Sequence, residues 1–468
     1  MGFNSTAFLL FFSTVLVVDM FLRHRGRLRK PFLLAASWFF YGCWDWRFLS
    51  LIIFSTVLDY CVGTRIHRSD NQRVRRCWLS LSLVGNLGLL GLFKYYDFFI
   101  DSLNQLLGAE LPLLNLILPI GISFYTFQTL SYTIDIYRRE LTPTKSPTDF
   151  ALFVAFFPQL VAGPIVRARN FLPQLEEGQA RPRRHDLAQG MAEIMSGLFK
   201  KVVIADTIGR SIVDPFYADP GSYGSYGAIL AIYAYAFQIY GDFDGYSRIA
   251  IGCGRMLGFK LPENFRSPYT ARTIVELIGR WHITLTEWIR DYFYTSIGGN
   301  RKGNARTLFN LVMTMFLAGL WHGAGWTYPV WGMLFGIGLM VSSIRARRRK
   351  AAGRELSDAP LAFAWQRFAT FSFWCFSGPF FRGDSFENAM EVWGAILRGG
   401  GGSHADGPHL ALTIACILWF CISPAPGRKL EGAVARLRPE LLGVLLALLL
   451  GLVAAMQTAA SPFIYFQF

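Results

Sequence analysis

A stretch of thirty-three residues, from Leu308 to Met340, contains no Asp, Glu, Lys or Arg. A run of that length exceeds the helices of soluble cores and can cross or enter a lipid bilayer. A single imidazole, His322, lies in its middle, between Trp321 and Gly323. An ionisable side chain inside an apolar run is costly and usually faces a cavity, which makes His322 a candidate functional residue. A structural histidine that bonds a helix carbonyl is an equally good interpretation of residue type alone.

The bulk composition extends this interpretation to the whole chain. Of its 468 residues, 53% are hydrophobic and 16% are charged, whereas about 25% are charged in ordinary soluble domains. We therefore predict an all-α polytopic membrane protein with about 11–13 membrane-embedded helices, since each crossing needs roughly twenty residues. No room remains for a large separate soluble domain. Residues 1–468 are expected to form one membrane-embedded domain with N-terminal spans (1–110), a central core (111–344) and C-terminal spans (345–468).

Basic residues outnumber acidic ones by 46 to 31. They gather in short clusters between apolar runs, which is typical of cytoplasmic loops and favours the lipid bilayer over nucleic acid as the partner. The cluster from Arg23 to Lys30 follows the first apolar segment, so we expect a cytoplasmic end there and an N-terminus outside. That first segment lacks a basic n-region and a cleavage site, so it is expected to be a retained span. Seven scattered cysteines without a CxxC spacing indicate neither a metal site nor a disulfide framework.

The apolar run from Phe150 to Val166 is expected to enter the membrane and return on the same side. Pro158 and the pair Gly163-Pro164 interrupt it, and both of its flanks are basic. A full crossing cannot start and end on one side, and irregular backbone at membrane depth is tolerated only where it lines a cavity. The sequence therefore predicts a re-entrant segment and a polar chamber within the membrane.

Two carboxylates, Asp242 and Asp244, follow the apolar run from Tyr226 to Tyr240. They lie close to Gln238, at a depth where acidic residues are unusual. They can cap a loop at the end of the span or form a polar wall of the chamber, and a structural role is the favoured one.

Residues 273–297 carry apolar side chains at three- and four-residue steps, with Arg280 among the residues between them. This spacing predicts an amphipathic helix at the membrane interface rather than a span. His282 lies on this helix and can meet His322 across the chamber.

The charge-free run is flanked by basic residues at both ends, which predicts a hairpin that turns at Gly323 and Gly325. Fifteen residues separate Thr307 from His322, or roughly 22 Å of helix, within a hydrocarbon core about 30 Å thick. Burial favours the neutral imidazole that a general base requires. Three interpretations of His322 remain open: a base in acyl transfer, a proton relay in a transporter or flippase, and an inert core histidine.

Six blocks of this sequence, in this order, resemble the membrane-bound O-acyltransferase family, in the branch that serves O-acetylation of bacterial exopolysaccharides such as alginate. The blocks are residues 118–138, 156–167 (FFPQLVAGPIVR), 238–252 (QIYGDFDGYSRIAIG), 263–269 (ENFRSPY), 279–294 and 317–332 (LAGLWHGAGWTYPVWG). The chain departs from the family at Gly279, where an arginine is usual, and at Arg248, where an aspartate is common.

The resemblance implies a hollow helical bundle whose tunnel reaches a central histidine from both faces. It maps the invariant histidine of the family onto His322, and its second histidine, an Asn or Asp in some members, onto His282. These two residues are the expected catalytic pair. The expected substrate-binding residues are Trp321, Trp281, Arg280, Asn264, Asp291, Asp242, Asp244 and Gln238.

The resemblance also implies a reaction in the bacterial inner membrane. The donor would be cytoplasmic acetyl-CoA or an acyl-carrier thioester, and no permanently bound cofactor or metal is expected. The acetyl group would reach a hydroxyl on the outer side, on a periplasmic acetyltransferase of the same pathway that acetylates a cellulose- or alginate-type polymer. A polysaccharide synthase or secretion complex is a further candidate partner.

Overall fold

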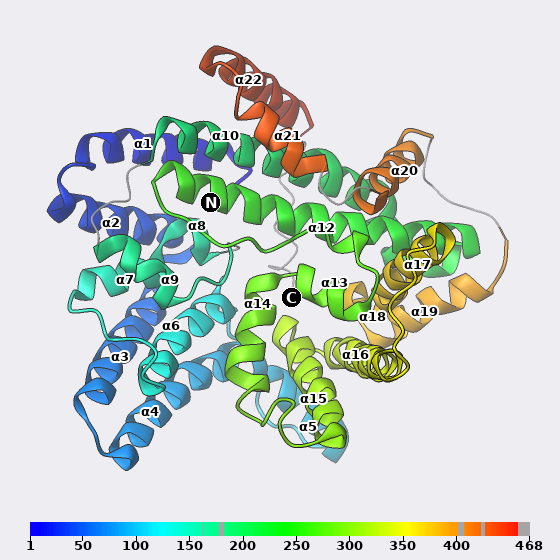
Figure 1. Cartoon of the computed structure of the whole chain (residues 1–468), viewed down its shortest axis with the longest axis horizontal. Helices are drawn as coiled ribbons and strands as arrows, with labels where there is room; N and C mark the ends of the chain where they lie inside the picture. Colours follow the sequence, from blue (N-terminus) through cyan, green and yellow to red (C-terminus); the bar gives the residue numbers. More distant parts are fainter. Residues whose placement is uncertain (162, 177–181, 401–406, 423–425, 457–468) are drawn as a thin grey trace. The chain divides into compact units, whose positions relative to one another are not determined.

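The computed structural model describes residues 1–161, 163–176, 182–400, 407–422 and 426–456 of the chain (Figure 1). Within these ranges the chain forms helices and no strand, which confirms the all-α prediction. The helices divide into two compact units, residues 1–194 with 247–262 and residues 195–246 with 263–468. The organisation into one membrane-embedded domain with three regions stays a prediction.

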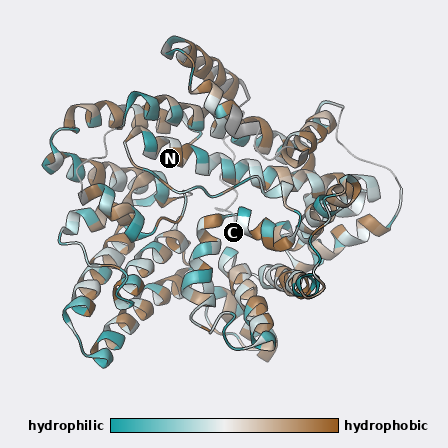
Figure 2. Cartoon of the chain, viewed as in Figure 1, coloured by the Kyte–Doolittle hydropathy of each residue, from teal (hydrophilic) through white to brown (hydrophobic). Residues whose placement is uncertain are grey.

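Three helical stretches of the described ranges are long and apolar enough to cross a membrane. They are Gly26–Arg68 (43 residues), Gln72–Leu107 (36 residues) and Thr327–Ala351 (25 residues). At a rise of 1.5 Å per residue, a single straight helix over the first stretch would extend about 64 Å, twice the hydrocarbon thickness. The helix is instead interrupted at Asp45, whose backbone is extended (φ −158°, ψ 111°). Shorter helices of the described ranges are also apolar, and Figure 2 shows hydrophobic residues along two of them, α20 and α22.

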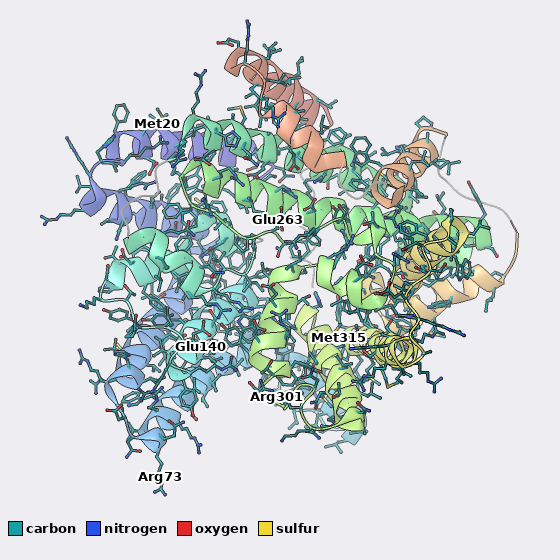
Figure 3. All side chains as sticks on the ribbon, viewed as in Figure 1. Met20, Arg73, Glu140, Glu263, Arg301 and Met315 are labelled. Carbon is teal, nitrogen blue, oxygen red and sulfur yellow. The ribbon has the colours of Figure 1, made fainter. Side chains whose placement is uncertain are left out.

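The first unit is formed mainly by the N-terminal helices. Their bounds are α1 Thr6–Leu22, α2 Gly26–Asp45, α3 Leu49–Arg68, α4 Gln72–Leu90, α5 Tyr96–Leu107, α6 Ile122–Tyr137, α7 Pro147–Ala155, α8 Phe157–Leu160 and α9 Ala168–Glu176, with short turns η1 Trp46–Phe48 and η2 Gly91–Tyr95. Helices α3, α4 and α6 pack against one another. The basic side chain of Arg73 lies near the start of α4, away from these contacts (Figure 3).

A buried ion pair stabilises the first unit near the start of the chain. The Arg29 guanidinium of α2 donates to the Asp19 carboxylate of α1 at 2.7 Å, and it also donates to the Leu257 carbonyl oxygen at 2.6 Å. Both charged side chains are buried. Arg29 therefore ties residues 247–262 to the N-terminal helices.

Two segments of the first unit are interrupted. Helix α6 begins only at Ile122, directly after Gly121, whose φ is +79°. The run from Phe150 to Val166 breaks at Phe156 into α7 and α8, which have 9 and 4 residues. Neither helix is long enough to cross a bilayer. The break is confirmed, while the return to the same side stays a prediction.

The second unit contains the helices that carry the candidate site. Its elements are η3 Phe199–Asp206, η4 Gly209–Val213, α11 Asp214–Ala218, η5 Pro220–Ser222, η6 Pro268–Thr270, α13 Ile274–Arg280, α14 Ile283–Trp288, η7 Ile289–Tyr294, α15 Asn304–His322, α16 Thr327–Ala351, α17 Pro360–Ser377, α18 Pro379–Arg382, α19 Phe386–Leu397, α20 Gly407–Ile422, α21 Pro426–Val434 and α22 Pro439–Met456. Two helices, α10 Arg184–Leu198 and α12 Ser225–Met256, have residues in both units.

The predicted hairpin around His322 is confirmed as α15 and α16, which pack side by side (Figure 1). The two helices approach closely at glycines. A Cβ atom on Gly319 would lie 2.2 Å from the Tyr328 carbonyl oxygen, and one on Gly332 would lie 2.1 Å from the Met315 carbonyl oxygen. Only glycine fits at these two positions, so the glycines determine how tightly the hairpin closes. Arg301 and Met315, marked in Figure 3, lie before α15 and in its middle.

Two expectations about helix boundaries are wrong. The span that begins near Tyr226 does not end before Gly241, because α12 continues to Met256; Asp242 and Asp244 therefore lie inside a helix and cap no loop. The amphipathic helix expected over residues 273–297 is interrupted between α13 and α14. The interruption falls at Trp281 and His282, where the backbone leaves the helical conformation.

Candidate active site

His322 is the last residue of α15, at the turn of the hairpin, and is 6% exposed. Three aromatic rings surround its imidazole. The ring centroids of Trp331 and Phe381 lie 5.4 Å and 5.1 Å away, both nearly edge-on, and that of Trp321 lies 5.1 Å away. The imidazole is thus enclosed by apolar surface, where its interaction with a substrate is little screened by water.

His282 stands in the break between α13 and α14, outside the apolar spans. Its backbone is left-handed (φ +42°, ψ +55°), and its side chain is 1% exposed. The Phe243 ring meets the imidazole nearly edge-on, with the ring centroids 4.6 Å apart. Burial lowers the pKa of His282 to about 3, so the imidazole is neutral at physiological pH.

Trp321 connects the two histidines. Its ring centroid lies 5.9 Å from that of His282 and 5.1 Å from that of His322, and the residue is buried. The structure therefore brings both predicted catalytic histidines into one aromatic cluster, although they are forty residues apart in the sequence.

A small apolar cavity lies beside this cluster. It is lined by Ile232, Tyr235, Ala236, Ile239, Trp281, Trp331, Trp374, Cys375, Gly378 and Phe381. Trp331 and Phe381 belong to the cavity wall and also contact His322. Trp281 contributes a further wall, with its ring 4.3 Å from that of Trp374. Two rings are therefore shared between the cavity wall and the surroundings of the His322 imidazole.

Asn264 holds the start of α14 in place. Its backbone oxygen accepts a hydrogen bond from the Ile283 N–H at 2.8 Å. Its side-chain Oδ1 accepts one from the Thr284 hydroxyl at 2.6 Å. Asn264 is 1% exposed. It therefore fixes the residues that directly follow His282.

Arg280 and Asp291 each form an ion pair with a residue close by in the sequence. Arg280 pairs with Glu276 one turn earlier and donates to the Thr270 hydroxyl at 2.7 Å. Asp291 accepts a hydrogen bond from the neighbouring Arg290 at 2.7 Å. These contacts orient the two side chains. A role for either in substrate binding stays a prediction.

Asp242, Asp244 and Gln238 all face the segment from η3 to η4. Asp244 forms an ion pair with Lys200 at 2.7 Å, and Asp242 forms one with Lys201. A Cβ atom on Gly209 would lie 2.5 Å from the Gln238 side-chain nitrogen, so that amide lies over the η4 backbone. All three were expected to bind substrate, and that role stays a prediction.

Several residues of the site were missed in the sequence, including Phe243, Trp331, Trp374, Phe381 and Thr284. No local signal distinguishes Trp374 and Phe381 from other aromatic residues of apolar helices. Phe243 carries such a signal, because it stands between two aspartates in the segment Gly241 to Gly245. In the described residues, no group of three His, Cys, Asp or Glu side chains could hold a metal ion.

Comparison with known proteins gives consistent matches over most of the chain. Residues 116–380 match the family model for membrane-bound O-acyltransferases. A probable alginate O-acetylase of Azotobacter vinelandii is 39% identical over 417 residues, covering 87% of this chain and 80% of the relative. A peptidoglycan O-acetyltransferase of Helicobacter pylori is 37% identical over 388 residues, covering 78% and 72%. A teichoic acid D-alanyltransferase of Streptococcus thermophilus is 29% identical over 258 residues, covering 52% and 61%.

Proposed function

Because this chain belongs to the membrane-bound O-acyltransferase family, and is therefore a membrane acyltransferase, we propose that it passes an acetyl group from a cytoplasmic thioester to a hydroxyl outside the inner membrane. The final acceptor is a secreted polysaccharide of the cellulose or alginate type. Membership of an acyltransferase family supports the acyl-transfer interpretation of His322 over the transporter interpretation.

One observation carries this proposal: aromatic rings that contact the buried imidazole at the turn of the α15–α16 hairpin also form part of the wall of a small apolar cavity. The Trp331 and Phe381 rings contact His322 and also line that cavity. Under this proposal the acetyl methyl group occupies the cavity, beside the rings that contact the imidazole. Enclosure by aromatic rings also keeps water, a competing acceptor, away from the reacting carbonyl.

In the proposed reaction, His322 takes the proton of the acceptor hydroxyl while the hydroxyl oxygen attacks the thioester carbonyl. The new C–O bond forms, the C–S bond breaks, and the thiolate leaves with the proton that the imidazole received. A general base needs a neutral imidazole within hydrogen-bond reach of that proton. Transfer through an acyl-histidine would balance equally, with the imidazole nitrogen as the first nucleophile. His282 belongs to the same aromatic cluster, because the Trp321 ring contacts both histidines.

The direction of transfer follows from the two compartments. Acetyl-CoA and acyl-carrier thioesters are cytoplasmic, whereas a secreted polymer is modified outside. We therefore propose a periplasmic acetyltransferase of the same pathway as the immediate acceptor, with a synthase or secretion complex as a further partner. The same proposal includes a periplasmic N-terminus, which the basic loop clusters support.

Replacing His322 by alanine tests this function. In cells that lack the native gene, the variant should leave the acetyl content of the secreted polymer about 1000-fold lower, or at background, because general base catalysis and positioning are lost together. Acetyl groups released from purified polymer by alkali provide the measurement. Protein in the membrane fraction is quantified in parallel by immunoblot.

His67 provides a matched control, because it is an exposed histidine at the end of α3. His67→Ala should acetylate the polymer as wild type does. Normal acetylation by His322→Ala at wild-type protein level would remove the catalytic role of His322. Acetylation that persists in the absence of the whole protein would remove the proposed function itself.

A further inference from the structure

The segment from Gly241 to Gly245 has a defined arrangement around the axis of α12. Successive residues of an α-helix are turned by about 100°, so Gly241 and Gly245 share one face and Phe243 lies on the opposite face. Asp242 and Asp244 then lie on the two flanks, one on each side. The five residues thus divide the helix into a glycine face, two acidic flanks and an aromatic face.

The glycine face meets the backbone of the preceding segment. A Cβ atom on Gly241 would lie 3.0 Å from the Lys200 carbonyl oxygen. One on Gly245 would lie 2.9 Å from the Gly197 carbonyl oxygen and 3.1 Å from the Lys201 nitrogen. Helix α12 is therefore in close contact with residues 197–201 along this face.

Two consecutive lysines reach around the two flanks. Lys200 binds Asp244 at 2.7 Å, and Lys201 binds Asp242. All four side chains are buried. Each lysine has a second carboxylate, since Lys201 lies 2.9 Å from Asp206 and Lys200 lies 4.0 Å from Glu431. The lysines therefore hold α12 from both sides.

The aromatic face of the same turn is in contact with His282. Phe243 is fully buried, and its ring meets the imidazole at 4.6 Å between centroids. A rotation of α12 by one residue, about 100°, would remove the ring from the imidazole and separate both ion pairs. Both the ion pairs and the ring contact therefore require the observed rotation of α12 about its axis.

We propose that Lys200, Lys201, Asp242 and Asp244 are positioning residues, which fix the rotation of α12 so that Phe243 holds the His282 imidazole in place. The expected effect of these residues on catalysis rests on the proposed function, whereas their effect on the position of His282 does not. The four residues act through the Phe243 ring on the aromatic face of the helix.

The test measures how fast diethyl pyrocarbonate modifies His282 in the purified, detergent-solubilised protein, by mass spectrometry of peptides. The double variant Asp242→Asn/Asp244→Asn removes both flank charges while conserving side-chain size. Asp206 and Glu431 remain beside the lysines in that variant. His282 should be modified about tenfold faster, because the ring contact opens more often. Polymer acetylation should fall about tenfold with it.

Asp19→Asn is the matched control. Asp19 is a buried aspartate with a cation at the same 2.7 Å, and it belongs to the other unit. It should leave the modification rate of His282 unchanged. Thermal unfolding of each variant separates a local change from a general loss of the fold.

A double-mutant cycle distinguishes positioning from general stabilisation. Phe243→Leu should by itself raise the modification rate, and adding Asp242→Asn/Asp244→Asn to it should change the rate no further. Unchanged modification in Phe243→Leu, or fully additive effects, would overturn the proposal. The modification rate of His282 does not depend on acetyl transfer. If the wild-type protein transferred no acetyl group while the variants showed the expected modification rates, the proposed function would be refuted and the positioning role would remain.

Discussion

At the scale of single residues, the site depends on contacts that fix backbone rather than on the two histidines alone. His282 occupies a left-handed conformation that few residues other than glycine, Asn, Asp and His adopt readily. Asn264 and Thr284 hold the chain directly after it, through the bonds at 2.8 Å and 2.6 Å. The sequence indicated Asn264 only through a family resemblance and did not indicate Thr284, because both act through a contact between segments twenty residues apart.

Replacing Thr284 by valine should slow acetyl transfer about tenfold, the change expected if roughly 1.4 kcal/mol of positioning is lost. Valine conserves the shape of the side chain but cannot donate to the Asn264 oxygen. The rate is measured as polymer acetylation per amount of membrane protein. Thr56→Val is the control, because the Thr56 hydroxyl bonds only within α3, to the Ile52 oxygen at 2.7 Å. Equal rates in both variants would contradict the role given to Thr284.

At the scale of elements, apolar length predicted the α15–α16 hairpin well, and glycine and proline predicted the break between α7 and α8. Two boundaries could not be predicted in this way. Gly241 reads locally as the end of a span, yet α12 continues because that glycine fits against Lys200. The periodicity over residues 273–297 predicts one helix, yet Asn264 holds a break at His282. Both errors come from partners distant in sequence, which no local pattern records.

Gly332→Ala should destabilise the protein by about 1–3 kcal/mol, because the added methyl group overlaps the α15 backbone and the hairpin must open. The Cβ atom would stand 2.1 Å from the Met315 carbonyl oxygen. The thermal unfolding midpoint of the solubilised protein is the measurement, and polymer acetylation should fall with it. In Gly443→Ala of α22, where a Cβ atom would meet nothing within 4 Å, the midpoint should stay or rise. Equal midpoints in the two variants would show that the close approach of α15 and α16 is unimportant.

At the scale of the whole molecule, composition was enough to predict the class of protein. Long apolar runs leave no other solution than membrane-embedded helices, and the described residues include three stretches of sufficient length. The basic clusters then predict which loops face the cytoplasm. Composition cannot identify the aromatic rings around His322, since Phe and Trp residues occur throughout the chain. Their contact with the imidazole is a property of tertiary packing.

Cysteine labelling tests the predicted orientation. Asp70→Cys lies between α3 and α4, where the side chain is 97% exposed, and Glu110→Cys lies in the exposed segment after α5. In intact cells, a membrane-impermeant maleimide should label position 110 but label position 70 only after permeabilisation. Both variants are made in a background without the exposed Cys43, Cys61 and Cys77. The reverse pattern would invert the proposed direction of acetyl transfer.

The left-handed backbone at residue 282 narrows which amino acids can be tried there. A β-branched replacement would be strained by its own main chain before its chemistry mattered, whereas asparagine or aspartate would enter without that penalty. In a set of variants at this position, backbone strain decides which ones fold correctly before any chemical effect can be seen. An inactive valine or isoleucine variant therefore carries no information about proton transfer.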